Sequence, residues 1–321
     1  MNWRPSADLA TLQERARILA GIRAFFAARG VWEVETPILC RVPVTDPQLE
    51  NLSTRFIGPG HAEGLMLYLH TSPEYAMKRL LAAGSGPIYQ ISKVFRQGEA
   101  GRRHNPEFSM LEWYRPGWDH HRLMDEVEAL VAPILGLQGT AQRLDYRQAF
   151  IEHVGIDPLI TDVPALRACA ECLGITGIDM GEERDAWLDL ILSHHIEPKL
   201  GQDGLCFLQH YPASQAVLAR LHPDDPRVAE RFELYYRGIE LANGFHELSD
   251  ADEQRRRFEQ DLESRRAQGL PEVPIDEALL AALTHGLPDC AGVALGLDRL
   301  IMLALGKTHI SEVLAFDFER C

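Results

Sequence analysis

Residues 87–116 read PIYQISKVFRQGEAGRRHNPEFSMLEWYRP, and this stretch decides the fold. The runs 88–95 and 108–114 are rich in β-branched and aromatic residues, which is typical of strands. A tight hairpin closes with a two-residue turn, but here residues 96–106 form a long polar loop that carries three arginines. A basic loop between two apolar strands indicates a site that binds an anion.

The second strand carries a carboxylate in an apolar row. Side chains alternate between the faces of a strand, so Phe108, Met110, Glu112 and Tyr114 share one face. A buried carboxylate needs a partner, which could be an internal salt bridge or water at a sheet edge. The neighbouring basic loop favours a ligand instead, because a molecule with a phosphate and an ammonium group would need both features side by side.

Length and composition indicate a globular protein. The 321 residues, 46% of them hydrophobic, can form a large core in one or two domains. We find no run long enough to span a membrane and no signal peptide. Six scattered cysteines indicate reduced thiols in a cytoplasm, and we interpret the pair Cys169 and Cys172 as core residues of a helix. The net charge of −15 opposes non-specific binding to nucleic acid.

The segments before the hairpin follow simple patterns. Residues 6–29 show helical spacing of apolar side chains, with Gly30 as a stop. A strand begins at 31 and is broken by Pro37, so we expect it at a sheet edge or an interface. Residues 45–64 lack periodicity and are predicted to be a loop, and 65–70 to be a strand.

A further helix is expected to begin at the sequence Ser72-Pro73-Glu74. Ser72 would cap it and Pro73 would take its first position. Glu74 suits the positive end of the helix dipole, so its presence is explained equally well by capping and by contact with a ligand.

The middle of the chain gives little information about function. Asp119 is expected to cap a helix that closes at Gly136, with His120 and His121 solvated in its first turn. Residues 140–226 are interpreted as a helical insertion or covering layer. Within it we expect helices near 145–154, 162–173 and 183–195, a strand near 204–210, and a structural role for His194 and His195.

Two strands near residues 231–247 combine carboxylates with apolar neighbours. Residues 237–238 mark the turn between them, and 243–244 could form a bulge that resets the register. Glu233, Glu240 and Glu247 are costly in such a sheet unless they meet cations. Mg²⁺ bound to nucleotide phosphates, or a substrate amine, would satisfy them.

The last patterned stretch is GVALGLDRLIMLALG at residues 292–306. It predicts a glycine-bearing strand followed by a helix, with Asp298 as the cap. Arg299 in the first helical turn adds a guanidinium to a helix N-terminus, which is a good anion site. The charged segment 250–269 is expected to be a solvated helix with ion pairs.

Together these stretches resemble the catalytic domain of class II aminoacyl-tRNA synthetases. RGVWEVETP, FRQGEAGRRHNPEFSMLEWY and GVALGLDRL look like the three ordered motifs of that family. The sequences HNPEF, ELANGFHEL and SPEYAMKRL are closest to its lysyl-type members. The resemblance implies an α+β fold, in which an antiparallel sheet is flanked by helices, and a homodimer interface at the first motif.

The helix of the first motif begins within the first dozen residues. We therefore expect residues 1–321 to form a single catalytic domain without an anticodon-binding domain. Such a lysyl-type core is similar to the elongation factor P lysine ligases. These enzymes activate (R)-β-lysine with ATP and transfer it to a lysine side chain of elongation factor P. The resemblance implies ATP and Mg²⁺ as cofactors, a cytoplasmic homodimer, elongation factor P as the protein partner, and no membrane or tRNA partner.

The same resemblance assigns roles to individual residues. Arg96 would bind the α-phosphate of ATP and Arg299 the γ-phosphate, and these two are the expected catalytic residues. Further ATP contacts would come from Gln97, Gly98, His104, Asn105, Phe108, Glu240, Leu241 and Gly296. Glu233 and Glu240 would hold Mg²⁺. The amino-acid pocket would consist of Ser72, Pro73, Glu74, Glu112, Tyr114, Asn243, Phe245, Glu247 and Ala294.

Two positions depart from the family pattern. The family usually has R-x-E in its second motif, but this chain has Gly98 there and Glu99 one residue later. The third motif usually has glycine where this chain has Ala294. A methyl group would reshape the amino-acid pocket, and we interpret it as part of a preference for β-lysine. One methyl group is worth about 1–3 kcal/mol of discrimination.

Three alternative functions are open to the same motifs. A minimal lysyl-tRNA synthetase-like enzyme acting on tRNA is disfavoured by the acidic charge and the missing anticodon module. A non-catalytic paralogue that senses amino acid or nucleotide is disfavoured because both arginines and the paired Mg²⁺ carboxylates are present. A ligase for another small amine is disfavoured by the lysine-type pocket. The motifs contain no evident general base, and Arg102 and Arg103 are candidates for docking the protein partner.

Overall fold

The computed structural model describes residues 3–321, which divide into two compact units. The first unit comprises the described residues up to Gly117 together with Ser249–Cys321, and the second is Trp118–Leu248. The predicted insertion at 140–226 falls inside the second unit. Each unit contains its own strands and helices, so each is described by itself.

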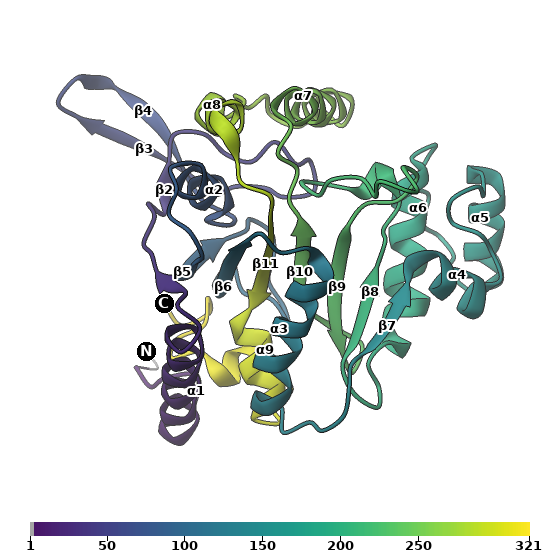
Figure 1. The fold of residues 1–321 in the computed structure, drawn as a ribbon, viewed down its shortest axis with the longest axis horizontal. Helices are drawn as coiled ribbons and strands as arrows, with labels where there is room; N and C mark the ends of the chain where they lie inside the picture. The colour runs from purple at the N-terminus through teal and green to yellow at the C-terminus, as the bar shows by residue number, and fades with distance from the viewer. Residues whose placement is uncertain (1–2) are drawn as a thin grey trace. The chain divides into compact units, whose positions relative to one another are not determined.

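The first unit is organised around the predicted hairpin (Figure 1). Its strands run side by side in the order β1-β5-β6-β11. β6 pairs with both β5 and β11 in antiparallel fashion, while the short β1 pairs with β5 in parallel. Both strands of the hairpin are confirmed, as is the long loop between them. The bounds of the four strands are β1 Trp32–Glu33, β5 Ile88–Phe95, β6 Glu107–Pro116 and β11 Cys290–Gly296.

An aromatic cluster packs the first helix onto this sheet. Phe26 is fully buried, stacks on Tyr89 with ring centroids 4.4 Å apart, and meets the edge of Trp113 at 5.4 Å. Asp8 caps the helix by accepting a hydrogen bond from the backbone of Thr11, at 2.7 Å. The helices of this unit are α1 Leu9–Ala27, α2 Glu74–Ala82, α7 Ala251–Ala267, α8 Glu277–Gly286, α9 Leu297–Ala304 and the short η4 Ile310–Val313.

The prediction that residues 45–64 form a loop is wrong. This stretch contains β3 Ser53–Gly58 and the start of β4 His61–Leu69, which join β2 Leu39–Cys40 in the order β2-β4-β3. Figure 1 shows the hairpin of β3 and β4 at the upper left. Nearly every side chain of β3 is exposed, so the strand has no buried face and the sequence shows no apolar alternation there.

The second unit combines strands in the order β10-β9-β8-β7 with several short helices. The three predicted helices and the strand near 204–210 are confirmed, whereas β7 was not predicted. Figure 1 shows α4 next to β7 and β8, and α5 beside α6. The bounds are α3 His120–Ile134, β7 Gln142–Asp145, α4 Tyr146–Val154, α5 Val163–Cys172, α6 Arg184–Ile191, η1 Leu192–Ile196, η2 Glu197–Lys199, β8 Cys206–Gln209, η3 Ala213–Gln215, β9 Arg231–Tyr236 and β10 Ile239–His246.

The hairpin of β9 and β10 confirms one prediction and corrects another. Arg237 and Gly238 both have positive φ, as a two-residue turn of this hand requires. The register shift lies between Glu240 and Ala242, not at residues 243–244. Beyond the shift, Asn243 pairs directly with Glu233.

The prediction that Asp298 caps α9 is wrong. Gly296 takes the N-cap position, and Asp298 lies in the first turn with its side chain buried. The Asp298 carboxylate accepts a hydrogen bond from the backbone N–H of Ser109 at 2.8 Å and pairs with Arg15 at 2.6 Å. This buried charge pair joins α1, β6 and α9, which are far apart in the sequence.

Two predictions about exposure are also wrong. His120 is only 1% exposed, although a position in the first turn of a helix suggested solvation. Cys172 is exposed rather than a core residue, and all six cysteines are free thiols.

None of the helices in residues 3–321 combines the length and the apolar character that crossing a bilayer requires.

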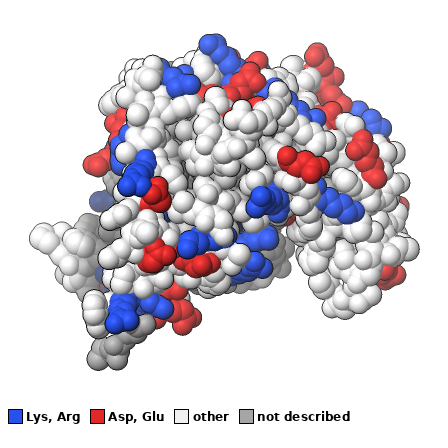
Figure 2. Space-filling view, turned by 90° about the horizontal axis from the view of Figure 1, so that it is seen from below, with Lys and Arg blue, Asp and Glu red and all other residues white. Residues whose placement is uncertain are grey.

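One face of the molecule carries both basic and acidic side chains. Figure 2 shows basic and acidic side chains interspersed on the face that it presents, with several basic ones close together near its lower middle. The excess of acidic residues therefore does not exclude local basic areas, although it opposes binding to nucleic acid as a whole.

The charge pair of α1 generates a prediction about stability. The Arg15 side chain is 14% exposed and its partner Asp298 is 1% exposed. Replacing Arg15→Met would leave a buried carboxylate without its cation, and we expect a loss of about 3 kcal/mol in the free energy of unfolding. Arg17→Met is the matched control, because Arg17 lies on the same helix with a side chain that is 71% exposed. The control should change stability by less than about 0.5 kcal/mol in urea unfolding. Equal losses in both variants would contradict this account.

Candidate active site

Glu112 lies at the centre of the candidate amino-acid pocket, in the middle of β6. It is 1% exposed, and its two oxygens accept hydrogen bonds from the Ser72 hydroxyl and the Tyr114 hydroxyl, each at 2.7 Å. The Ser72 hydroxyl also accepts the backbone N–H of Glu74 at 3.0 Å. The helix α2 begins at Glu74 with Pro73 as its N-cap, so Ser72 holds the start of α2 while donating to Glu112. The structure thus brings these predicted pocket residues together within the first unit.

Glu74 has a partner that we did not predict. The Lys78 ammonium lies 2.7 Å from a Glu74 oxygen, and the lysine side chain is almost completely buried. The spacing of the two residues on α2 is i, i+4, which is the signal in the sequence that could have found this pair. Lys78 therefore fixes Glu74 and satisfies one of its oxygens.

The register of β6 and β11 places Ala294 beside Glu112. These two residues pair directly across the strands, and directly paired residues point to the same face of a sheet. Gly292 pairs with Tyr114 in the same way, and Gly296 pairs with Met110. The methyl group of Ala294 consequently lies on the face that carries the Glu112 carboxylate.

The loop after β5 gathers cationic side chains around His104. The Arg299 guanidinium lies 2.6 Å from His104 Nε2, and since arginine can only donate, His104 accepts through this nitrogen. Burial, followed by the charge of Arg299, lowers the pKa of His104, and Arg96 and Arg103 act in the same direction. The two arginines predicted to bind phosphate are therefore close enough to act on one imidazole. Such a cluster of guanidinium groups is suited to binding phosphate.

The departure from the family pattern at Gly98 has a backbone explanation. Gly98 has φ of +80°, a conformation that residues with a side chain rarely adopt. The carboxylate of the next residue, Glu99, lies 3.5 Å from the Arg96 guanidinium, and Arg96 also sits over the Phe108 ring at 5.2 Å. An acidic side chain thus contacts Arg96 even though the usual position holds glycine.

Two predicted ATP residues hold the loop itself. The Asn105 side chain donates to the backbone carbonyl of Glu107 at 2.7 Å and accepts from the backbone of Phe318 at 3.0 Å. The Gln97 side chain donates to Glu50 at 2.8 Å. These contacts show how the loop is anchored, and a nucleotide contact from either side chain stays a prediction.

In the second unit, the Glu233 carboxylate contacts one arginine and two tyrosine side chains. One oxygen pairs with Arg231 at 2.5 Å, and the other accepts hydrogen bonds from Tyr211 at 2.5 Å and from Tyr235 at 2.6 Å. Arg231 also donates to Asn243 at 3.3 Å, which links the two predicted site residues Glu233 and Asn243. The cation that this carboxylate requires is thus supplied in part by the protein.

A third carboxylate, Glu197, belongs to this group and was missed. The Tyr235 hydroxyl lies 3.2 Å from Glu197 and 2.6 Å from Glu233. Burial, followed by the charges of Glu233 and Glu240, raises the pKa of Glu197 to about 7. No spacing in the sequence indicated this contact, because Glu197 lies in η2, far from both strands in the chain.

These carboxylates fit a divalent cation. Mutual repulsion among Glu197, Glu233 and Glu240 is the condition that Mg²⁺ would relieve, and carboxylate oxygens are the ligands it prefers. Glu240 is half-buried on β10, just before the register shift. The other predicted residues of this strand and its end, Leu241, Phe245 and Glu247, are buried.

Comparisons with known proteins show the family of this chain. The family model of class II tRNA synthetases (D, K and N) matches residues 1–320. A relative from Yersinia enterocolitica is 58% identical over 99% of this chain and 98% of its own length. Relatives from Edwardsiella ictaluri and Pectobacterium carotovorum are 57% and 56% identical over the same shares. All three are named elongation factor P--(R)-beta-lysine ligase. The chain belongs to the class II tRNA synthetase family (D, K and N), within its group of elongation factor P--(R)-beta-lysine ligases.

Proposed function

We propose that this protein activates (R)-β-lysine with ATP and transfers it to a lysine side chain of elongation factor P. The observation that carries the proposal is the full-length similarity, at 56–58% identity, to ligases of that name. The buried Glu112 network and the arginines around His104 support it, because they provide the anionic and cationic parts that such substrates require.

In the first step, a carboxylate oxygen of (R)-β-lysine attacks the α-phosphorus of ATP. The new P–O bond forms as the bond from the α-phosphorus to the bridging oxygen breaks, and pyrophosphate leaves. The protein mainly positions the reactants and neutralises charge in such a reaction. Arg96 would contact the α-phosphate and Arg299 the γ-phosphate, so that both guanidinium groups stabilise the negative charge that develops.

Carboxylates of the second unit would hold the Mg²⁺ of the nucleotide. Glu240 and Glu233 are the proposed ligands, and Glu197 adds negative charge beside them. Bound Mg²⁺ supplies charge neutralisation at the phosphate oxygens. Arg231, Tyr211 and Tyr235 would keep Glu233 in a fixed position, because each already contacts its oxygens. His104, Phe108 and Gly296 would surround the nucleotide.

The two ammonium groups of the substrate would be recognised by carboxylates. Glu112 is the first candidate, because it is buried in the middle of β6 and the hydroxyls of Ser72 and Tyr114 orient its oxygens. Glu247 is the second candidate, while Glu74 already pairs with Lys78. The methyl group of Ala294, on the face of Glu112, would favour a substrate whose amine sits one carbon further from the carboxylate.

In the second step, the ε-amine of a lysine in elongation factor P attacks the carbonyl carbon of the adenylate. An amide bond forms, AMP leaves with the electron pair of the broken C–O bond, and the amine loses a proton. We assign no general base for this proton. Arg102 and Arg103 are proposed to contact the protein partner, and Arg102 Nε is fixed by a hydrogen bond to the Thr308 carbonyl at 2.8 Å.

We further propose that the protein acts as a cytoplasmic homodimer. The first motif leaves Trp32 53% exposed on the edge strand β1, and the nearby Ile38 and Leu39 are also exposed. An apolar edge of this kind is expected to be covered by a second copy of the chain. Six free thiols are consistent with a reducing compartment.

The phosphate role of Arg299 can be tested directly. Arg299→Ala should reduce ATP–pyrophosphate exchange with (R)-β-lysine by at least about 1,000-fold, because a guanidinium that stabilises phosphoryl transfer contributes 10³–10⁵ in rate. Arg266→Ala is the control, since Arg266 is an exposed arginine paired with Glu272 on the surface. The control should keep its exchange rate. Retained exchange in the folded Arg299→Ala protein would remove Arg299 from the phosphate site.

The substrate assignment requires a separate experiment. The protein, ATP and Mg²⁺ are incubated with elongation factor P and either (R)-β-lysine, α-lysine or no amino acid, and the mass of elongation factor P is measured. We expect a mass increase equal to one β-lysyl group, with α-lysine giving a smaller yield. Incubation with lysine tRNA should give no appreciable charging. Efficient charging of tRNA together with an unchanged mass of elongation factor P would favour the tRNA synthetase alternative.

The raised pKa of Glu197 predicts that the stability of the protein depends on pH. The folded-state pKa of Glu197, about 7, lies above its ordinary value, so its ionisation destabilises the folded protein as pH rises toward and through 7. Glu197→Gln should therefore be more stable than the natural protein by about 1–3 kcal/mol at pH 8, and equal to it near pH 4. Urea unfolding at both pH values measures the difference, with the exposed Glu263→Gln as control.

Adding Mg²⁺ gives a second test, which again compares the stability of Glu197→Gln with that of the natural protein. If the cation binds beside Glu197, it favours the ionised carboxylate and should reduce the stability difference between Glu197→Gln and the natural protein at pH 8. A difference that is the same at pH 4 and pH 8 would contradict the proposed raised pKa.

A further inference from the structure

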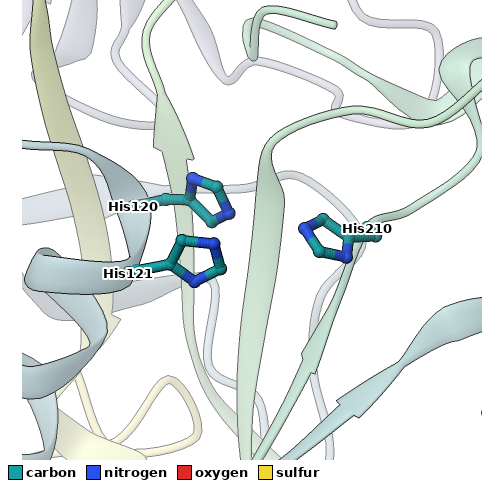
Figure 3. A group of neighbouring side chains, drawn as sticks. All are labelled: His120, His121 and His210. Carbon is teal, nitrogen blue, oxygen red and sulfur yellow. The ribbon is translucent and has the colours of Figure 1, made fainter. Parts of the chain in front are cut away.

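Three histidines of the second unit lie together outside the proposed active-site residues. His120 and His121 begin α3, and His210 follows β8. Ring centroids are 4.0 Å apart for His120 and His121, 5.7 Å for His120 and His210, and 6.0 Å for His121 and His210. In Figure 3 each ring directs a nitrogen toward the space that the three rings share.

The nitrogen atoms of this cluster lie close enough together to hold a metal ion. One ring nitrogen from each of the three residues lies within 4.8 Å of the others. His120 is 1% exposed, yet neither of its ring nitrogens makes a hydrogen bond. His210 Nε2 is likewise buried without a hydrogen-bond partner. The buried nitrogens of His120 and His210 that remain unsatisfied require a partner that the described residues do not provide.

The other nitrogen of His210 is held by a carboxylate. His210 Nδ1 lies 2.8 Å from an Asp145 oxygen, and Asp145 also accepts a hydrogen bond from Gln209 at 3.0 Å. A carboxylate on the far nitrogen fixes the proton there and leaves Nε2 with its lone pair, which is the arrangement seen behind histidines that bind metal. The Asp145–His210 pair thus orients a ligand toward the space between the three rings.

We propose that His120, His121 and His210 bind a Zn²⁺ ion. Imidazole nitrogen suits zinc and the neighbouring transition metals, whereas Mg²⁺ and Ca²⁺ prefer oxygen ligands. Zinc holds its nitrogen ligands at about 2 Å, so small rotations of the three side chains would close the site around the ion. His121 is exposed, which gives the ion a route from solvent and leaves a fourth position for water.

A second grouping shares His120 but is already occupied by protein contacts. His120, Glu230 and His246 are all buried, and their ligand atoms also lie close together. Glu230 pairs with His246 Nδ1 at 2.8 Å and with Arg220 at 2.5 Å. Glu230 and His246 already pair with each other in this grouping, whereas the ring nitrogens of His120 and the Nε2 of His210 have no hydrogen-bond partner among the described residues, so the grouping with His121 is the better site.

The ion would connect two segments of the second unit. His120 and His121 lie at the N-terminus of α3, and His210 lies in the segment after β8, about 90 residues later. Binding would cross-link these segments and stabilise the folded unit, because the unfolded chain does not hold the three ligands together. This inference is independent of the proposed ligase activity.

The experiment uses the full chain and Zn²⁺ itself. The protein is treated with a chelator, dialysed, and titrated with Zn²⁺ in competition with a chromophoric chelator, and Co²⁺ is used as a spectroscopic probe. We expect one Zn²⁺ per chain, a rise in the unfolding temperature, and no displacement by a large excess of Mg²⁺. His121→Gln and His210→Gln should each weaken binding at least ten-fold and change the visible spectrum of bound Co²⁺.

The matched control is the double variant His194→Gln/His195→Gln. These two histidines are also adjacent in the chain and accessible to solvent, but no third imidazole joins them among the metal-binding groups of the described residues. The control should bind Zn²⁺ as the natural protein does. His121→Gln changes an exposed side chain, so it tests the site even if the change at His210 disturbs folding. Absence of stoichiometric binding, or equal affinity in His121→Gln and the natural protein, would overturn the proposal.

Discussion

Glu112 lies in the middle of a strand that is paired on both sides, and its ionised oxygens are removed from water. A carboxylate in that position destabilises the fold unless donors meet it. Ser72 and Tyr114 meet it with hydroxyl groups, and Ser72 also holds the start of α2. The position of α2 against β6 therefore depends on satisfying one buried charge. The same requirement places Asp298 against Arg15 and Ser109 and so fixes α9.

The second unit meets this requirement differently. Glu233 is paired with a guanidinium from its own strand and with two tyrosine hydroxyls. A carboxylate whose charge the protein neutralises in part serves as a rigid support. In the proposed site, Glu112 meets the substrate amine, and Glu240, with Glu197 and Glu233 beside it, meets a divalent cation.

Much of the candidate site was predictable because alternation and motif spacing are local properties of the chain. The hairpin with its basic loop, the inward Glu112, the turn at Arg237 and the strand leading to Arg299 were all predicted from residue order. The hairpin of β3 and β4 was missed because a strand without a buried face shows no periodicity. The burial of His120 was missed because a helix N-terminus is usually solvated, whereas here the rings of His210 and His246 lie against it.

The sequence by itself determined which residues could carry charge to a nucleotide and an amine, since three ordered motifs lie at fixed positions in the chain. Only the tertiary structure decided which charge each of them meets. Lys78 on Glu74, Arg15 on Asp298 and Glu197 beside Glu233 join residues by contact in space. Two of these three pairs are separated by many residues, so no local pattern records them. The energy of a buried charge depends on its neighbours within a few ångströms, and those neighbours exist only once the chain has folded.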